Sequence, residues 1–111
     1  MLDPMADRRG APRFPVILVA EVTELGSLTL LTARTSDISR TGCYIDTLNP
    51  MPVGTLARVR LRHGEEFFAA NARVAYVCPG LGMGMAFDKN VAAEQLAILD
   101  RWLAGAATVR V

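Results

Sequence analysis

Apolar and polar residues alternate along most of the chain with a period of two, which indicates half-buried β-strands. The first such stretch runs from Phe14 to Thr23, where every second side chain, counted from Phe14, is apolar. In the stretch 68–76 the same period places Tyr76 on one face with Phe68 and Val74. The other predicted strands are 28–37, 43–47, 57–62, 68–76 and 81–87.

Turn-forming residues separate the predicted strands at Gly26-Ser27, in the loop from Asn49 to Gly54, at His63-Gly64-Glu65 and at Pro79-Gly80. Strands that are joined in series by hairpins tend to close into a small barrel, because closure removes the unpaired edges. In the last strand Gly82 and Gly84 alternate with larger residues, so another backbone or a ligand is expected to approach that face closely.

The last element changes period and predicts a helix. Its apolar residues recur with helical spacing and form one stripe: Leu96, Ile98, Leu99, Trp102 and Leu103. Asp88 or Asn90 can cap the start of this helix, and Gly105 can end it. The chain is therefore mainly β, with one C-terminal helix that is expected to cover one mouth or one side of the barrel.

Composition and charge fit a single globular domain. The chain has 111 residues, of which 51% are hydrophobic. Lys and Arg number 12 and Asp and Glu 11, so the net charge of +1 argues against binding nucleic acid or a membrane through bulk positive charge. No apolar run reaches the roughly 18 residues of a membrane span, and the N-terminus lacks the apolar core of a signal peptide. A cytoplasmic protein is expected.

The chain offers little for catalysis or for metal binding. Its only histidine is His63, and no zinc-type Cys/His spacing surrounds it. Since no nucleophile is placed beside His63 by the sequence, neither an enzyme nor a cofactor is predicted. Cys43 and Cys78 stand in apolar runs, so two buried free thiols are expected, with one disulfide as the open alternative.

A first cluster of candidate residues lies at the end of a polar arm formed by residues 1–13. Arg8, Arg9 and Arg13 place three guanidinium groups within six residues. A guanidinium donates paired hydrogen bonds that match two phosphate oxygens or the O6 and N7 atoms of guanine, and its flat face can stack on a base. Such an arm suits a nucleotide with both groups. The alternative is a solvated basic tail.

A second cluster, Asp37-Ile38-Ser39-Arg40-Thr41-Gly42, stands at the end of a predicted strand. Asp37 and Ser39 are two residues apart, so in extended backbone both point to the same face. A carboxylate and a hydroxyl side by side can accept from and donate to the edge of a base. Gly42 permits positive φ or a close backbone approach. The alternative is a turn that is held by side-chain to backbone hydrogen bonds.

Taken together, the two clusters resemble the signature of the PilZ domain family. The matching positions are Arg9 and Arg13 with RxxxR spacing, followed by Asp37, Ser39 and Gly42 with DxSxxG spacing. The first motif comes just before the first strand and the second lies between the second and third strands, as in the family. The run GLGMGMAF at 80–87 also resembles the family's last barrel strand. The resemblance extends over nearly the whole chain, from about residue 8 to residue 103.

The resemblance implies a six-stranded antiparallel β-barrel with a C-terminal α-helix and a site for cyclic di-GMP on its outer surface. The implied ligand-binding residues are Arg8, Arg9, Arg13, Asp37, Ser39 and Gly42. The two motif arginines are expected to grip phosphate and guanine, and the Asp and Ser to contact a guanine. Gly42 lets the chain pass close to the ligand. Arg8 lies outside the strict pattern and is expected to assist in ligand binding. No role is assigned to Arg40, which also lies outside the pattern.

The expected function is that of a cyclic di-GMP receptor. Residues 1–13 form a flexible arm and residues 14–105 the barrel and helix. The nucleotide would pull the arm onto the barrel, and an unidentified partner protein would recognise the changed surface. One alternative is a protein-interaction adaptor with weak or no nucleotide binding. Another is a barrel that binds nucleic acid through the arm and the basic strand of Arg58, Arg60 and Arg62.

Overall fold

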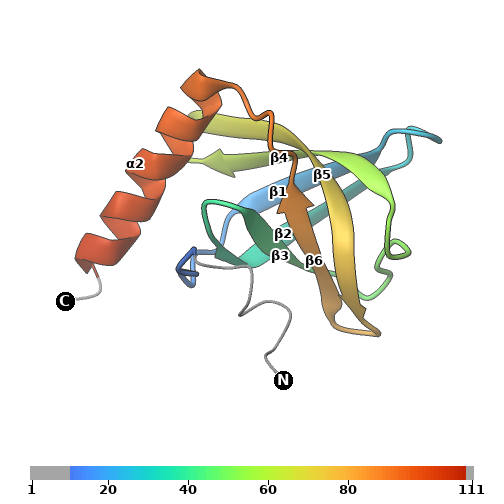
Figure 1. Ribbon diagram of the computed structural model, residues 1–111. Coiled ribbons are helices and arrows are strands. Elements are labelled where there is room, and N and C mark those ends of the chain that lie inside the picture. Colours follow the sequence, from blue (N-terminus) through green and yellow to red (C-terminus); the bar gives the residue numbers. More distant parts are fainter. Residues whose placement is uncertain (1–10, 110–111) are drawn as a thin grey trace.

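The computed structural model describes residues 11–109, with side chains as far as residue 106. Its elements are β1 (Val19–Glu24), β2 (Leu30–Ile38), β3 (Gly42–Asp46), β4 (Leu56–His63), β5 (Glu66–Cys78), β6 (Gly82–Phe87) and α2 (Ala93–Val109). The strands pair antiparallel in the order β1-β2-β3-β6-β5-β4, and pairing of β4 with β1 closes the barrel (Figure 1). The predicted six-stranded antiparallel barrel with one C-terminal helix is confirmed.

The alternating pattern separates the inside of the barrel from its outside. On β4, Ala57, Val59 and Leu61 are fully buried, whereas the arginines that alternate with them, Arg58, Arg60 and Arg62, are exposed. Met83 and Met85 of β6 also lie in the core and pack with residues such as Phe68. Burial of these apolar side chains away from water is the main force that holds the barrel together.

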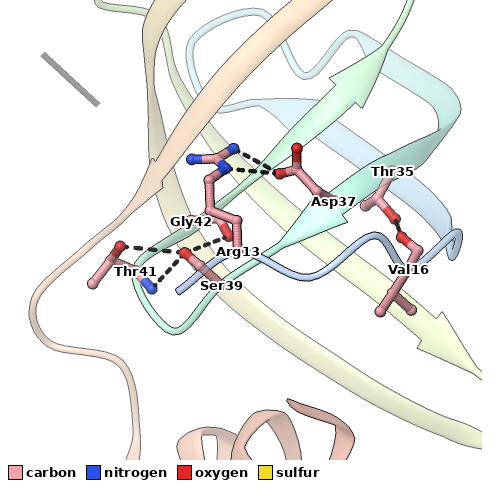
Figure 2. Close-up of polar contacts among 7 residues, drawn as sticks. All are labelled: Arg13, Val16, Thr35, Asp37, Ser39, Thr41 and Gly42. Carbon is pink, nitrogen blue, oxygen red and sulfur yellow. Dashed lines mark hydrogen bonds and ion pairs between the residues drawn. The ribbon is translucent and has the colours of Figure 1, made fainter. Parts of the chain in front are cut away.

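The first strand is shorter than predicted, because residues 14–18 do not continue the β1 ladder. Phe14 instead forms a bridge to Ile38 through two backbone hydrogen bonds of 2.8 and 3.0 Å. Buried Thr35 then holds the following residues. Its Oγ1 accepts from the Leu18 N–H at 2.9 Å. The same hydroxyl donates to the Val16 carbonyl at 2.7 Å, a contact that Figure 2 shows. A side chain thus replaces part of the ladder in a segment where Pro15 has no N–H to donate.

The prediction that Tyr76 shares a face with Phe68 and Val74 is wrong. The pairing of β5 with β6 shifts between Val74 and Tyr76, so a β-bulge sends Tyr76 to the outer face. There it lies opposite Gly84, and Tyr44 of β3 lies opposite the same glycine from the other side, with the two ring centroids 6.1 Å apart. A Cβ added at Gly84 would overlap the Tyr76 ring. The predicted close approach of another backbone is confirmed at Gly82, where a Cβ would overlap the Ile45 carbonyl oxygen of β3. At Gly84 the approaching group is the Tyr76 side chain.

Helix α2 begins and ends later than predicted. Neither Asp88 nor Asn90 caps it: the Asp88 carboxylate accepts from the Asn90 N–H at 3.0 Å within the preceding loop. The helix runs through Gly105 to Val109. Gly105 is not among the positive-φ residues, so it does not form the left-handed C-cap that would have stopped the helix.

The helix packs beside the end of the β4–β5 hairpin (Figure 1). Leu99 is fully buried against the barrel core. Glu66 of β5 accepts from Trp102 Nε1 at 3.0 Å and from the Arg101 guanidinium at 2.7 and 2.8 Å. His63 stacks on the Trp102 ring with centroids 5.4 Å apart. Apolar and polar contacts together therefore fix α2 to one side of the barrel.

Both cysteines are free, which rules out the disulfide alternative. Cys43 is buried as predicted, whereas Cys78 is only half-buried. No helix within residues 11–109 is long and apolar enough to cross a membrane.

Candidate functional site

The antiparallel bridge between Phe14 and Ile38 brings the end of the arm to β2, where Arg13 reaches Asp37 diagonally across the pairing. Arg13 Nε and Nη2 both donate to Asp37 Oδ1, at 3.1 and 2.7 Å (Figure 2). The two side chains are 29% and 31% exposed, so the pair stands at the surface but is partly shielded from water. The structure thus brings together one residue from each of the two motifs, 24 positions apart in the sequence.

Ser39 is almost fully buried in the short loop between β2 and β3. Its N–H donates to the Gly42 carbonyl at 2.8 Å, and its Oγ accepts from the Thr41 N–H at 3.2 Å. The same hydroxyl lies 3.3 Å from the Gly42 carbonyl and 3.3 Å from Thr41 Oγ1 (Figure 2). For Ser39, the turn interpretation of this motif therefore describes the structure well, whereas the Asp37 side chain points to Arg13.

Gly42 is needed where two strands come very close. A Cβ added there would overlap the carbonyl oxygen of Met85 on β6. Its φ is not positive, so the glycine serves the close approach and not a left-handed backbone. The neighbour that approaches is the β6 backbone. The expected approach of a ligand to Gly42 stays a prediction.

A cavity of about 290 Å³ opens between the arm, the β2–β3 loop, β5 and β6. Arg13, Ser39 and Gly42 line it, while Asp37 stands outside the lining and holds Arg13. Arg8 and Arg9 lie outside the described residues. The cavity therefore brings together Arg13, Ser39 and Gly42 on one part of the outer surface, and Asp37 joins them only through its contact with Arg13.

Tyr76 and Lys89 also line this cavity and were not singled out from the sequence. Tyr76 was missed because a period of two assigns it to the core, and only the bulge in β5 turns it outward. Lys89 carried one weak signal, a cation directly after the last strand. It reaches the cavity because the loop that follows β6 passes the entrance.

Arg40 belongs to the same loop but faces another way. Its Nε donates to Asp100 Oδ1 of α2 at 3.0 Å, in a pair whose side chains are 57% and 48% exposed. Arg40 does not line the cavity. It links the loop of the second motif to the C-terminal helix.

The charged pair also acts on a buried thiol behind it. Burial raises the pKa of Cys43 to about 12 from its ordinary value of 9.0. Within this net shift the negative charge of Asp37 also raises the pKa, and the positive charge of Arg13 lowers it. The Cys43 thiol is therefore neutral at physiological pH and is a core residue, not a nucleophile.

Fold and cavity together describe a small barrel with a cavity on its outer surface, next to an arginine from the N-terminal arm. The family model described as PilZ domain matches residues 7–105. The chain therefore belongs to the PilZ domain family, a family of cyclic di-GMP receptors that are typically not catalytic. Residues 11–109 contain no group of three His, Cys, Asp or Glu side chains that could hold a metal ion.

Solved structures of PilZ domains share this fold. The PilZ domain of CeSA from a cellulose-synthesising bacterium matches with a TM-score of 0.67 and 22% identity, over 85% of this chain and 96% of that one. The PilZ domain of YcgR from Escherichia coli, whose structure contains c-di-GMP, matches with a TM-score of 0.73 and 18% identity, over 93% and 94% of the two chains.

A third similar structure is the Bacillus subtilis inhibitor of motility MotI/DgrA, with a TM-score of 0.74 and 17% identity. The match covers 94% of this chain but only 54% of the Bacillus protein, so this chain corresponds to about half of that protein. The comparison with curated protein sequences gave no match. At these identities the structural likeness establishes the fold alone.

Proposed function

We propose that this domain binds cyclic di-GMP at the cavity beside the Arg13–Asp37 pair and thereby regulates a partner protein. The observation that supports this most directly is the contact itself, since Arg13 Nη2 lies 2.7 Å from Asp37 Oδ1. It holds a guanidinium at the edge of a cavity that Ser39 also lines. The arginine of the arm therefore needs no long movement to meet a nucleotide in this cavity.

The pair retains hydrogen-bonding capacity for a ligand. Arg13 uses Nε and Nη2 on the single oxygen Oδ1, so within residues 11–109 its Nη1 and Asp37 Oδ2 make no hydrogen bond. Guanidinium N–H groups donate to phosphate oxygens or to O6 and N7 of guanine. A carboxylate oxygen accepts from the N–H groups of guanine. A guanine nucleotide can thus bind both members of the pair without first separating them.

Arg9 lies four positions before Arg13 and, with Arg8, is proposed to hold the phosphates. Fixing the backbone of an arm residue opposes binding by about 1–2 kcal/mol. A hydrogen bond to a charged group contributes about 1.5–3 kcal/mol, so a few such bonds from the arginines offset the ordering of a short segment. The surface formed by arm, nucleotide and barrel then differs from the ligand-free surface, and a partner protein can distinguish the two.

Calorimetry with cyclic di-GMP tests this proposal. Arg13→Ala is expected to weaken binding at least about tenfold, because charge-assisted hydrogen bonds to the nucleotide are lost. Arg34→Ala is the matched control. Arg34 forms a similar pair with Asp46 at 3.4 Å, is more exposed, and lies outside the cavity, so its loss should leave the affinity unchanged.

GTP and GMP serve as control ligands and should bind much more weakly than cyclic di-GMP. Equal affinity of the wild type and Arg13→Ala for cyclic di-GMP would refute the proposed grip. A folded wild-type protein that does not bind the nucleotide would favour the adaptor interpretation instead.

A further inference from the structure

A second cavity, of about 410 Å³, lies on the outer barrel surface near the start of β4 and the end of β6. Leu25 and Leu56 form part of its wall and are 43% and 58% exposed. The Leu25 N–H donates to the Leu56 carbonyl at 3.0 Å, so the two leucines are direct neighbours. Grouped apolar side chains that face water on a small domain mark a docking surface more often than isolated ones do.

The turn next to these leucines is strained. Leu28 has a φ of 63° and its side chain is 70% exposed. A non-glycine residue in this conformation is disfavoured by roughly 1–3 kcal/mol, and such strain is often retained at functional surfaces. Leu30, at the start of β2, is 57% exposed. The β1–β2 turn therefore extends the apolar surface beyond the cavity.

The rim of the cavity is positively charged. Five arginines of the described chain form ion pairs with carboxylates: Arg13, Arg34, Arg40, Arg60 and Arg101. Arg73 and Lys89 line the cavity, and neither forms an ion pair within residues 11–109. Arg58 beside the cavity donates to Asn71 at 3.3 Å and forms no ion pair in the described part of the chain. Asp88 also lines the cavity, and its Oδ1 accepts from the Asn90 N–H. It keeps its negative charge, so two cations against one carboxylate leave the lining with a net positive charge.

This surface is continuous with the candidate nucleotide site. In the strand register Leu56 pairs with Arg73, Arg73 with Ala86, and Ala86 with Gly42 of the second motif. Each step between paired residues spans about 5 Å. Ala86, Phe87 and Lys89 line both cavities. A partner on the leucine side would therefore lie next to any nucleotide in the first cavity.

We propose that this surface docks an acidic segment of a partner protein that carries a large apolar side chain. The apolar side chain would pack against Leu25 and Leu56, and its acidic neighbours would pair with Arg73 and Lys89. The unpaired cations favour an acidic partner over a second copy of the chain, which would bring like charges together in a two-fold interface. The leucines favour protein over single-stranded nucleic acid, which prefers aromatic stacking surfaces. Docking does not require the nucleotide.

NMR-monitored titrations of the isotope-labelled 111-residue chain test this docking. The probes are three synthetic peptides of equal length: one with Leu and Glu at helical spacing, one with Lys in place of Glu, and one with Ser in place of Leu. The acidic leucine peptide alone is expected to shift the amide signals of Leu25, Leu56 and Arg73. Arg73→Glu should weaken its binding about tenfold, and Leu56→Ser about threefold or more.

Arg62→Glu and Leu81→Ser are the matched controls. Arg62 lies at the other end of β4 and Leu81 in the β5–β6 turn, both are exposed, and neither lines the cavity. These variants should bind the acidic peptide as the wild type does, and melting temperatures show that every variant is folded. All the substituted side chains face water, so the barrel core is left intact.

Several results would overturn the docking surface: equal binding of the lysine peptide, signal shifts confined to another face, tighter binding of a single-stranded oligonucleotide at the same residues, or dimerisation of the chain through this surface. Calorimetry with cyclic di-GMP on the same samples keeps the two proposals apart. If the chain binds the acidic peptide but not cyclic di-GMP, the proposed function alone is refuted. If it binds cyclic di-GMP but not the peptide, the docking surface alone is refuted.

Discussion

At the scale of single residues, several motif positions contribute to the fold as well as to the candidate chemistry. Ser39 holds the β2–β3 loop through hydrogen bonds to its own backbone neighbours. Gly42 lets β3 and β6 pair where any side chain would strike the β6 backbone. Among the motif residues within 11–109, the Arg13–Asp37 pair alone keeps side-chain hydrogen-bonding groups without a partner. Loss of ligand binding after substitution of Ser39 or Gly42 therefore needs a stability measurement beside it.

Gly42→Ala is expected to destabilise the protein by about 2 kcal/mol, or about 10 °C in melting temperature, because its Cβ would overlap the Met85 carbonyl. Gly26→Ala is the control. Its nearest neighbour would be Glu24 Oε2 at 3.9 Å, so a change within about 0.5 kcal/mol is expected. Thermal unfolding compares the two. A normal melting temperature for Gly42→Ala together with weaker nucleotide binding would contradict the role in strand packing.

The buried Cys43 thiol is expected to make the folded protein less stable at alkaline pH. Burial, and then the charge of Asp37, raise its pKa from 9.0 to about 12 in the folded protein. The unfolded chain therefore loses this proton first as the pH rises above about 9, and stability falls between about pH 9 and 12. The slope attributable to one such group is about 1.4 kcal/mol per pH unit. Below pH 9 the contribution is fully retained.

Denaturant unfolding of the wild type and Cys43→Ala, between about pH 8 and 10, measures this contribution. The variant should lose about 1 kcal/mol less than the wild type over this range, whatever its stability at neutral pH. The difference isolates Cys43 from Tyr44, whose pKa is also raised by burial and by its hydrogen bond to Cys78. If the free energy of unfolding changed with pH equally in the wild type and in Cys43→Ala, the thiol would not be shielded as the structure indicates.

At the scale of elements, the strands follow from local patterns and their ends do not. A period of two is a local property, so the alternation on β4 could be assigned directly. The start of β1 depends instead on Thr35 of the neighbouring strand β2, because its hydroxyl forms hydrogen bonds with the Val16 carbonyl and the Leu18 N–H. The bulge that turns Tyr76 outward likewise depends on how β5 pairs with β6. Such boundaries are decided by partners that are remote in the sequence.

Helix α2 offers a substitution that should stabilise the protein. Gly105 lies inside the helix, without positive φ and with open space where a Cβ would stand. Gly105→Ala should therefore raise the free energy of unfolding by about 0.5–1 kcal/mol, since glycine is a poor helix former. Gly64→Ala is the contrasting control, because Gly64 has a φ of +63° in the β4–β5 turn and should lose stability. A lower melting temperature for Gly105→Ala would contradict the helix end at Val109.

At the scale of the whole molecule, the arm and the barrel are joined through β2. Thr35→Val keeps the side-chain volume but leaves the Leu18 N–H and the Val16 carbonyl without their partner. A loss of about 1–3 kcal/mol is expected. Amide exchange at Phe14 and Leu18 should become faster, and cyclic di-GMP binding weaker, because Arg13 is no longer held beside Asp37.

Thr32→Val is the control for this substitution, since Thr32 is exposed on the same strand and makes no side-chain hydrogen bond within residues 11–109. It should change neither amide exchange nor nucleotide affinity. If Thr35→Val left the exchange at Leu18 unaltered, the hydrogen bonds of Thr35 would not be what holds this segment.

The sequence by itself determined the number and type of the elements, the outward and inward faces of most strands, and the motif positions. These properties are local, because they depend on residues two to four positions apart. Only the tertiary structure decided that Arg13 meets Asp37, that Tyr76 and Lys89 share a cavity with Ser39, and that unpaired cations gather beside Leu56. Each of these depends on the strand register, which closure of the barrel sets through contacts between distant parts of the chain.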